Sequence, residues 1–351
     1  MDLIDYKKLA NLPGVSSFEG RVSSYIKNEL EKRPDNVISK DMLSSLIVKR
    51  EGLKENVKLM VASHIDEVGF IVEDIVGDFL KLKNIGSVWP HLVVGQIYKL
   101  INQQGKSFRG IISSPASHGL SKKERSKTLG LDQIYLDLGL SKEDFKNLNI
   151  NIGDQVLPES FDIKESNPEI LISKAADNRI SAYIGMEVMS NYLDNKSDIY
   201  WAFTSQEEPG LRGARTTSSL IKPDLAISID TTLAGDIPFD KNSVSLGSGV
   251  CLSFIDSNSI SHRGFMNYII DLCKENNISH QFAVFNKGGT DMGNIHKSAD
   301  GVIGMSLSIP VRYMHSSFTM ANTRDVDECI KLIKLICEKI CKKDFERIIN
   351  Q

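Results

Sequence analysis

The stretch that decides the fold is KLMVASHIDEVGF, residues 58–70, an almost continuous apolar run that leads into a histidine and an aspartate. Such a run predicts a strand that is buried on both faces, as in the parallel part of an α/β sheet. His64 and Asp66 are two residues apart, so on an extended backbone their side chains leave the same face. Polar groups at the carboxyl ends of such strands meet in a crevice, and the stretch therefore predicts a site at that edge.

Three more strand-like runs carry a carboxylate or a histidine at their ends: IYWAFTSQEEPGLRGA (199–214), DLAISID (224–230) and VIGMSLSIPVRYMH (302–315). A fifth segment, LISKAADNR (171–179), adds an aspartate just before an expected helix. Together they supply five candidate metal ligands: His64, Asp177, Glu208, Asp230 and His315. Mixed imidazole and carboxylate ligands suit zinc, cobalt or manganese, and two neighbouring ions need a bridging carboxylate.

Glu207 and Glu208 are adjacent at the end of an apolar strand, where two carboxylates are costly unless cations or protons compensate them. On an extended backbone they would point apart, so Glu208 could bind metal while Glu207 acts as a general base. Each candidate also has a structural reading. A surface histidine for His64, a helix N-cap for Asp177, a turn residue for Asp230 and a solvated loop for the glutamates stay open at this point.

The texture of the chain changes between about residues 72 and 160, where short alternating runs lie between glycine, asparagine, serine and proline turns. This pattern is typical of a small antiparallel sheet or barrel. Before it, Ser16 and Glu19 have capping-box spacing and predict the start of a helix. After it, strands and helices alternate to the end. We therefore expect an α/β domain, residues 1–71 and 161–351, with a mainly parallel sheet flanked by helices and a β-rich domain inserted at 72–160.

Composition excludes several other classes of protein. The 351 residues carry a net charge of −3, which gives no basic field for nucleic acid. No run reaches the roughly 18 apolar residues of a membrane span. The five cysteines have no paired spacing, which favours reduced thiols and a cytoplasmic location.

The segments HIDEVGF, KAADNR, TSQEEPGLRGA, DTTLAGD, GGTDMGNIH and SIPVRYMHS, in this order across residues 64–316, resemble the M42 metallopeptidase family, the glutamyl and tetrahedral aminopeptidase group. The resemblance implies a zinc-exopeptidase-like α/β domain with an inserted PDZ-like dimerisation domain. It also implies an aminopeptidase that removes N-terminal residues from short peptides. The family's assemblies imply a dimer-based homo-oligomer, up to a dodecamer.

Site roles follow from the same resemblance. It implies two divalent metal ions per subunit, zinc or cobalt first and manganese as a further candidate. Asp177 would bridge the two ions, with His64 and Asp230 completing one position and Glu208 and His315 the other. Glu207 matches the general base, and Asp66 the residue that orients His64.

Three residues depart from the family pattern. Pro209 follows Glu208 where a small aliphatic residue is more usual, and its fixed φ could shift that carboxylate. Met292 and Asn294 stand where smaller residues are expected, and they would alter specificity if they lined the substrate pocket. His296 is expected to have a structural role.

Two other functions compete with the aminopeptidase. A glycoside hydrolase needs two carboxyl groups facing each other across a sugar, and that reading leaves both histidines and Asp177 unexplained. A non-catalytic oligomeric scaffold would be expected to lose at least one ligand or the base, and all six residues are present.

Overall fold

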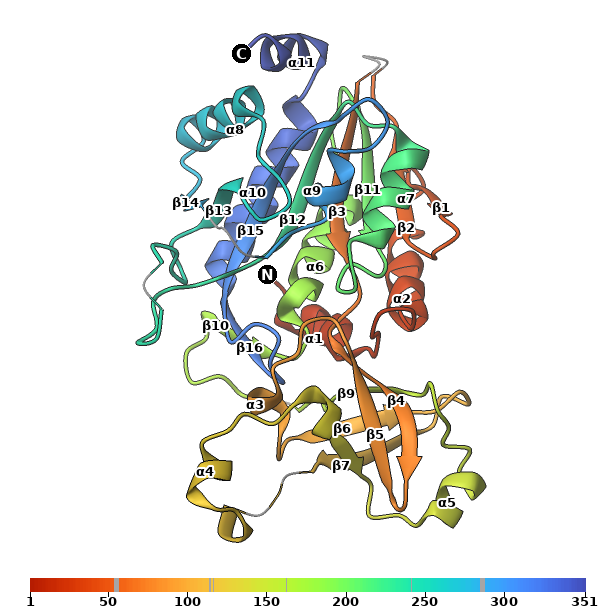
Figure 1. Ribbon diagram of the computed structural model, residues 1–351. Coiled ribbons are helices and arrows are strands. Elements are labelled where there is room, and N and C mark those ends of the chain that lie inside the picture. Colours follow the sequence, from red (N-terminus) through yellow and green to blue (C-terminus); the bar gives the residue numbers. More distant parts are fainter. Residues whose placement is uncertain (54–56, 114, 116, 162, 241, 285–287) are drawn as a thin grey trace.

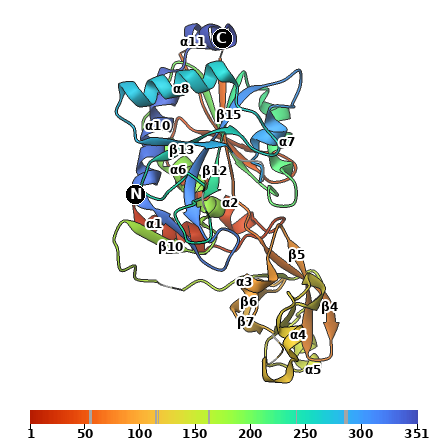
Figure 2. The same cartoon turned by 60° about the vertical axis from the view of Figure 1, so that its left-hand side comes forward.

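The computed structural model describes residues 1–53, 57–113, 115, 117–161, 163–240, 242–284 and 288–351. It has two parts, a large sheet covered by helices and a smaller β-barrel that lies below it in Figure 1. Figure 2 shows the same arrangement after a 60° turn, with the barrel still joined to one end of the sheet-containing part. Among the described residues, no helix has both the length and the apolar character needed to cross a bilayer.

The large sheet has ten strands. Eight of them follow one another in the order β1 (Val37–Lys40), β2 (Leu46–Arg50), β11 (Asp198–Thr204), β3 (Lys58–His64), β12 (Leu225–Leu233), β15 (Ile303–Arg312), β13 (Val250–Ile255) and β14 (His280–Val284). In addition, β16 (Thr319–Asn322) pairs with the end of β15, and β10 (Ile170–Ser173) pairs with β16.

The sheet is mixed, so the expectation of a mainly parallel sheet is confirmed for its centre but not for its margins. The central strands β11, β3, β12 and β15 are parallel neighbours, as are β13 and β14. The pairs β1–β2, β2–β11, β13–β15, β15–β16 and β10–β16 are antiparallel. Residues 41–45 join β1 to β2 and residues 313–318 join β15 to β16, and connections this short can only link antiparallel neighbours.

Helices cover both faces of the sheet. On one face lie α1 (Leu3–Asn11), α2 (Gly20–Leu30), α6 (Ala176–Ser190), α8 (Arg263–Glu275) and α10 (Thr323–Lys339), with α11 (Lys342–Ile349) packed on α8. On the other face lie α7 (Arg212–Ile221) and α9 (Met292–Ile295). β3 is buried on both faces as predicted, because Leu59 and Val61 join one apolar cluster and Met60 and Ala62 the other.

The barrel is closed and antiparallel. Its strands are β4 (Gly69–Val76), β5 (Phe79–Ile85), β8 (Tyr135–Asp137), β7 (Ser107–Ile112), β6 (Ile97–Ile101) and β9 (Gln155–Pro158), in that order around the barrel. The short helices of this part are α3 (Pro90–Val93), α4 (Lys122–Arg125), α5 (Lys142–Asn147) and the 3₁₀ turns η1 (Ser117–Gly119) and η2 (Leu131–Gln133). It has an apolar core of its own, which includes Phe70, Leu80 and Tyr98. The β-rich texture between residues 72 and 160 thus corresponds to a barrel.

The predicted capping box at Ser16 and Glu19 does not form. α2 begins at Gly20, and Glu19 caps it with its backbone only, because its side chain makes no capping hydrogen bond. Both side chains are buried, with 3% of Ser16 and 4% of Glu19 exposed. They have different partners, which belong to the site described next.

Candidate metal centre

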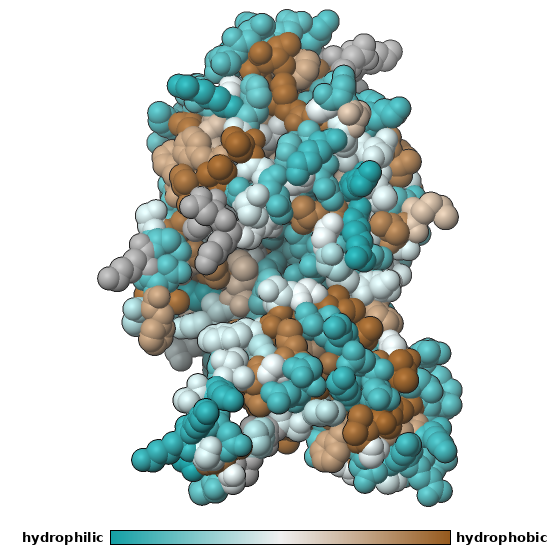
Figure 3. All heavy atoms as spheres, viewed as in Figure 1, coloured by the Kyte–Doolittle hydropathy of each residue, from teal (hydrophilic) through white to brown (hydrophobic). Residues whose placement is uncertain are grey.

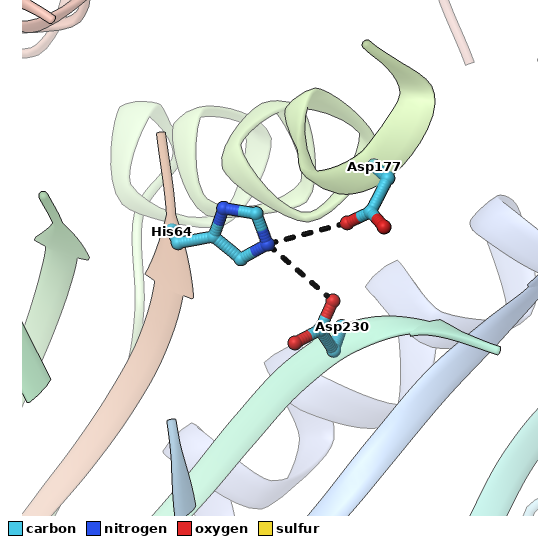
Figure 4. A group of neighbouring side chains, drawn as sticks. All are labelled: His64, Asp177 and Asp230. Carbon is cyan, nitrogen blue, oxygen red and sulfur yellow. Dashed lines mark ion pairs between the residues drawn. The ribbon is translucent and has the colours of Figure 1, made fainter. Parts of the chain in front are cut away.

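His64 is the last residue of β3 and lies at the centre of the site, with only 2% of its side chain exposed. Its Nε2 atom lies 3.2 Å from Oδ1 of Asp177 and 3.6 Å from Oδ1 of Asp230. Figure 4 shows the three side chains converging from three elements: β3, the start of α6 and β12. Asp230 lies inside β12, which continues to Leu233, rather than at the strand's end as expected from the sequence. Parallel β3 and β12, with the start of α6, bring these ligand atoms together.

Asp177 faces two histidines. Its Oδ2 atom lies 3.2 Å from Nε2 of His315, and this nitrogen lies 3.6 Å from Oε1 of Glu208. His315 follows β15 and has a φ of +57°, an uncommon value for a residue with a side chain. Two groups of potential ligands therefore share Asp177, namely His64–Asp177–Asp230 and Asp177–Glu208–His315, with the ligand atoms of each within 4.8 Å of one another. The structure thus brings together all five predicted metal ligands.

Glu207 and Glu208 do not point apart, and the expectation drawn from an extended backbone was wrong. β11 ends at Thr204, and Gln206 has a φ of +53°, so the chain turns before it reaches the glutamates. One carboxylate oxygen from each lies within 4.8 Å of a nitrogen of His64. The nearest oxygen of Glu207, Oε2, is 3.9 Å from Nε2 of His64. Both carboxylates therefore face the same centre.

Asp66 is fully buried and contacts the Nδ1 side of the His64 ring. Its Oδ1 atom lies 3.4 Å from Nδ1 of His64, on the side of the ring away from Asp177. It also accepts hydrogen bonds from the backbone amides of Glu207, at 3.0 Å, and Glu208, at 3.2 Å. The hydroxyl of Ser16 donates to Asp66 Oδ2 at 2.6 Å. Asp66 therefore contacts both the histidine and the glutamate-bearing loop.

A cavity of about 370 Å³ opens over these residues. The metal-ligand candidates and Glu207 line one side, and Thr231, Leu233, Asn258 and Met314 are among its other lining residues. Ser87, which follows β5 of the barrel, lines it too. In Figure 3 the molecular surface is hollowed between the sheet-containing part and the barrel. The cavity thus has walls from both parts of the chain.

Met292 and Asn294 are not among the cavity-lining residues, so the expectation that they would shape specificity from the pocket wall finds no support. Met292 is 1% exposed and packs in the apolar cluster under α9. The amide of Asn294 donates to the carbonyl of Leu211 at 2.8 Å. His296 is the C-terminal cap residue of α9, and its ring contacts the carbonyl of Met292, which agrees with the structural role expected for it.

The cluster contains more acidic than basic groups, and the pKa values of its members are shifted. Burial raises the pKa of Glu208 to about 8 and holds the pKa of Glu207 well above its usual value. Burial opposes the charged form of His315, yet ion pairs with Asp177 and Glu208 raise its pKa to about 9. Burial also opposes charge on Asp177, but the neighbouring His315 and His64 lower its pKa. Without cations, the cluster therefore retains protons.

Metal ions fit this cluster. Oδ1 of Asp177 and Oε1 of Glu208 are buried and make no hydrogen bond with any described residue, although each lies within ion-pairing distance of a histidine. Buried polar atoms in proteins are normally satisfied, and a bound cation would satisfy these. The donor set of two imidazoles and three carboxylates suits zinc or cobalt, and replacing protons by cations would relieve the charge imbalance.

Several residues at the site carry no signal of their own in the sequence. The spacing of Ser16 and Glu19 indicates only a helix cap, and Ser87 lies in a segment without a motif. Asp291 is buried and accepts a hydrogen bond from the hydroxyl of Thr204, and burial raises its pKa to about 7. Only tertiary contacts reveal Ser16, Glu19 and Ser87 as residues of the site, whereas Asp291 lies in the GGTDMGNIH segment.

The fold and the five converging candidate metal ligands resemble those of a metallopeptidase, and comparison with known proteins gives the family. Residues 44–332 match the family model described as M42 glutamyl aminopeptidase. The chain belongs to the M42 peptidase family.

Relatives in this family differ in their named substrates. The chain is 30% identical to the lysyl aminopeptidase of Pyrococcus furiosus, over 97% of each chain. It is 29% identical to the glutamyl aminopeptidase of Lactococcus lactis, over 100% of each chain. The crystal structure of a TET aminopeptidase from the marine sediment archaeon Thaumarchaeota archaeon SCGC AB-539-E09 is also similar, with a TM-score of 0.93, 28% identity and 98% of each chain covered.

Proposed function

We propose that this protein is a metal-dependent aminopeptidase that removes N-terminal residues from short peptides. The observation that carries the proposal is the position of Asp177, whose two oxygens each lie 3.2 Å from a different histidine. A carboxylate in this position can bridge two divalent ions, and two-ion sites with a bridging carboxylate serve hydrolysis. Membership of the M42 family and the names of the relatives support the same activity.

We assign the ligands as two groups that share Asp177. His64 and Asp230 would hold one ion, and Glu208 and His315 the other. Zinc and cobalt fit this donor set best, and manganese is a further candidate. Bound ions would polarise the scissile carbonyl and lower the pKa of a water molecule.

The remaining site residues handle protons and orientation. Glu207 is the proposed general base, because it faces the centre and burial raises its pKa toward the range in which a carboxylate both takes and returns a proton. It would take a proton from the attacking water and return it to the leaving amine. Asp66 would orient His64 through Nδ1, leaving Nε2 free to bind an ion.

The two alternatives are less well supported. Because Glu207 and Glu208 face one centre, two facing carboxylates do exist, but a glycoside hydrolase would give no role to the two histidines that flank Asp177. A scaffold would have no need for a buried cluster of acids that is costly to maintain without cations.

The proposal extends to assembly and location. We propose a dimer-based homo-oligomer, up to a dodecamer, and a PDZ-like dimerisation role for the barrel, with domain boundaries at 1–71, 72–160 and 161–351. Exposed apolar side chains on the barrel, Val76, Phe79 and Ile111, support a contact surface there. The cytoplasmic location is supported by five free cysteines.

The deciding experiment uses a panel of short peptides, each with a free and an N-acetylated amino terminus. Zinc- or cobalt-loaded protein is expected to release residues stepwise from free termini only. A chelator should abolish the release, and added metal should restore it. Three results would overturn the proposal: cleavage that resists the chelator, cleavage of acetylated peptides, or no cleavage by protein shown to carry two ions.

A further inference from the structure

The turn that precedes α2 reaches the active site with two buried side chains. Ser16 donates its hydroxyl hydrogen to Oδ2 of Asp66 at 2.6 Å. Glu19 accepts a hydrogen bond from the backbone amide of Gln206 at 3.0 Å, through Oε1. Capping-box spacing predicted that these two side chains would bond to one another's backbone, yet neither does so. Their partners are instead the carboxylate beside His64 and the residue before Glu207.

The loop formed by Gln206, Glu207 and Glu208, here called the glutamate loop, is held by two carboxylates that accept hydrogen bonds from its three backbone amides. The amide of Gln206 donates to Glu19, and those of Glu207 and Glu208 donate to Asp66. Gln206 has a φ of +53°, a conformation that non-glycine residues rarely adopt and that the surroundings must hold in place. This backbone turn directs the side chains of Glu207 and Glu208 toward the same centre. Their direction therefore depends on the hydrogen bonds made by the three amides.

The N-terminal turn, residues 14–19, has a separate anchor. The amide of Gly14 donates to Oε1 of Glu67 at 3.1 Å, and the amide of Glu67 donates to the carbonyl of Gly14 at 3.0 Å. Glu67 is itself paired with buried Lys174 and Arg179. The turn therefore stays attached to the end of β3 without help from Ser16 or Glu19, whose side chains are free to act on the loop opposite.

We propose that Ser16 and Glu19 are positioning residues of the active site, which fix the Gln206–Glu208 backbone through Asp66 and directly. This inference rests on the function proposed above for Glu207 and Glu208. Neither residue touches the reacting atoms. Ser16 fixes the orientation of Asp66, and Asp66 and Glu19 together hold the three amides that set the direction of the glutamate side chains.

The test compares four variants with the wild type. Ser16→Ala removes the hydroxyl that donates to Asp66, and Glu19→Ala removes the carboxylate that accepts from the amide of Gln206. Glu19→Gln keeps a side chain of the same shape, with an oxygen that can still accept this hydrogen bond. Ser23→Ala is the matched control, because Ser23 is another buried serine nearby whose hydroxyl has no hydrogen-bond partner among the described residues. Hydrogen–deuterium exchange is followed at the amides of residues 206–208, and kcat and KM are measured on the metal-loaded protein.

Ser16→Ala and Glu19→Ala are expected to exchange at these amides at least about tenfold faster, because the contacts that hold the loop closed are lost. They should also lose roughly 10- to 100-fold in kcat, as is usual when a residue supporting a metal ligand is removed, with KM within about twofold. Glu19→Gln and Ser23→Ala should resemble the wild type in both. Unchanged exchange in both alanine variants would overturn the inference, as would an equal loss in Ser23→Ala.

The exchange measurement requires no turnover. If the wild type cleaves no peptide, the proposed function fails while the exchange comparison still decides whether Ser16 and Glu19 hold the loop. If the wild type is active but the variants exchange and react normally, only this inference fails.

Discussion

Asp66 accepts a hydrogen bond from the backbone amide of Glu207 at 3.0 Å, so a residue after β3 and a residue after β11 share one buried contact. The strands are parallel neighbours, with Thr204 opposite His64 in the register. Chain segments 141 residues apart are therefore aligned at the same edge of the sheet. The roles proposed for the residues of this cluster differ, and a substitution can test each of them separately.

Replacing Asp177 by alanine should cost metal binding at both positions at once. The shared carboxylate is the only member common to the groups His64–Asp177–Asp230 and Asp177–Glu208–His315. We expect metal affinity, measured by titration calorimetry, to fall at least about a hundredfold, beyond the loss typical of outer contacts. Asp224→Asn is the control, since its carboxylate accepts a hydrogen bond from the amide of Lys58, at the opposite end of β3 from His64. If the Asp177 variant still bound two ions tightly, the bridging assignment would be wrong.

Glu207→Gln should keep its metal and lose its activity. The amide has the same shape as the carboxylate but cannot accept a proton, so kcat should fall at least about a hundredfold. Metal content, determined by elemental analysis, should match the wild type because Glu207 lies outside both ligand groups that share Asp177. Near-normal turnover in this variant would remove Glu207 from the role of base.

Metal-free protein should become less stable as the pH rises from about 6 to 9. The pKa of His315 is raised to about 9, and that of Glu208 to about 8, so both bind protons more tightly in the folded state than in the unfolded state. Folding therefore takes up protons, and the stability that they contribute disappears as they dissociate. The midpoint of thermal unfolding, followed by circular dichroism in the presence of a chelator, should fall across this range.

Metal-loaded protein is the control for the pH experiment. Cations would replace the protons, and their affinity rises as competing protons leave. Its unfolding midpoint should fall less over the same range, or rise. Identical pH profiles with and without metal would contradict the idea that protons occupy the cluster in place of cations.

Gly185→Ala should destabilise the sheet-containing part. A β-carbon at Gly185, within α6, would lie 2.4 Å from Cε2 of Trp201 and 2.8 Å from Cε1 of Phe203, and rings buried in a core cannot easily move aside. We expect a loss of about 1–3 kcal/mol in the free energy of unfolding, measured with denaturant.

Gly20→Ala provides the comparison for Gly185. Gly20 is also in a helix, α2, but a β-carbon there would meet nothing within 4 Å. Alanine is the better helix former, so this variant should be neutral or slightly stabilised. Equal effects at both positions would show that packing against Trp201 is not what requires glycine.

The site was more predictable from the sequence than the details of the fold. The candidate ligands lie at or near the ends of long apolar strands, and the topology of an α/β sheet brings such strand ends together, so His64, Asp230 and His315 could be grouped from the sequence alone. The direction of the strands at the margins of the sheet depends on the lengths of their connections and on which strands pair. The apolar runs in the sequence encode neither.

Local spacing rules failed where tertiary contacts replaced local ones. Glu207 and Glu208 were expected to diverge on an extended strand, but the positive φ of Gln206 ends it. Ser16 and Glu19 had the right spacing for a cap, but buried partners after β3 and in the loop after β11 compete for the same side chains. Met292 lies within the GGTDMGNIH segment, directly after Asp291, but its apolar side chain packs in the core.

The cavity wall contributed by Ser87 has a consequence for inhibition. The neighbouring Gly86 packs so closely that a β-carbon there would lie 3.0 Å from Oε2 of Glu208. The barrel and the sheet therefore meet directly at a proposed metal ligand. For the proposed enzyme, a compound that bound between the barrel and the sheet would displace Glu208 and enlarge the cavity, and this boundary therefore offers a route to inhibition that needs no contact with the proposed metal ions.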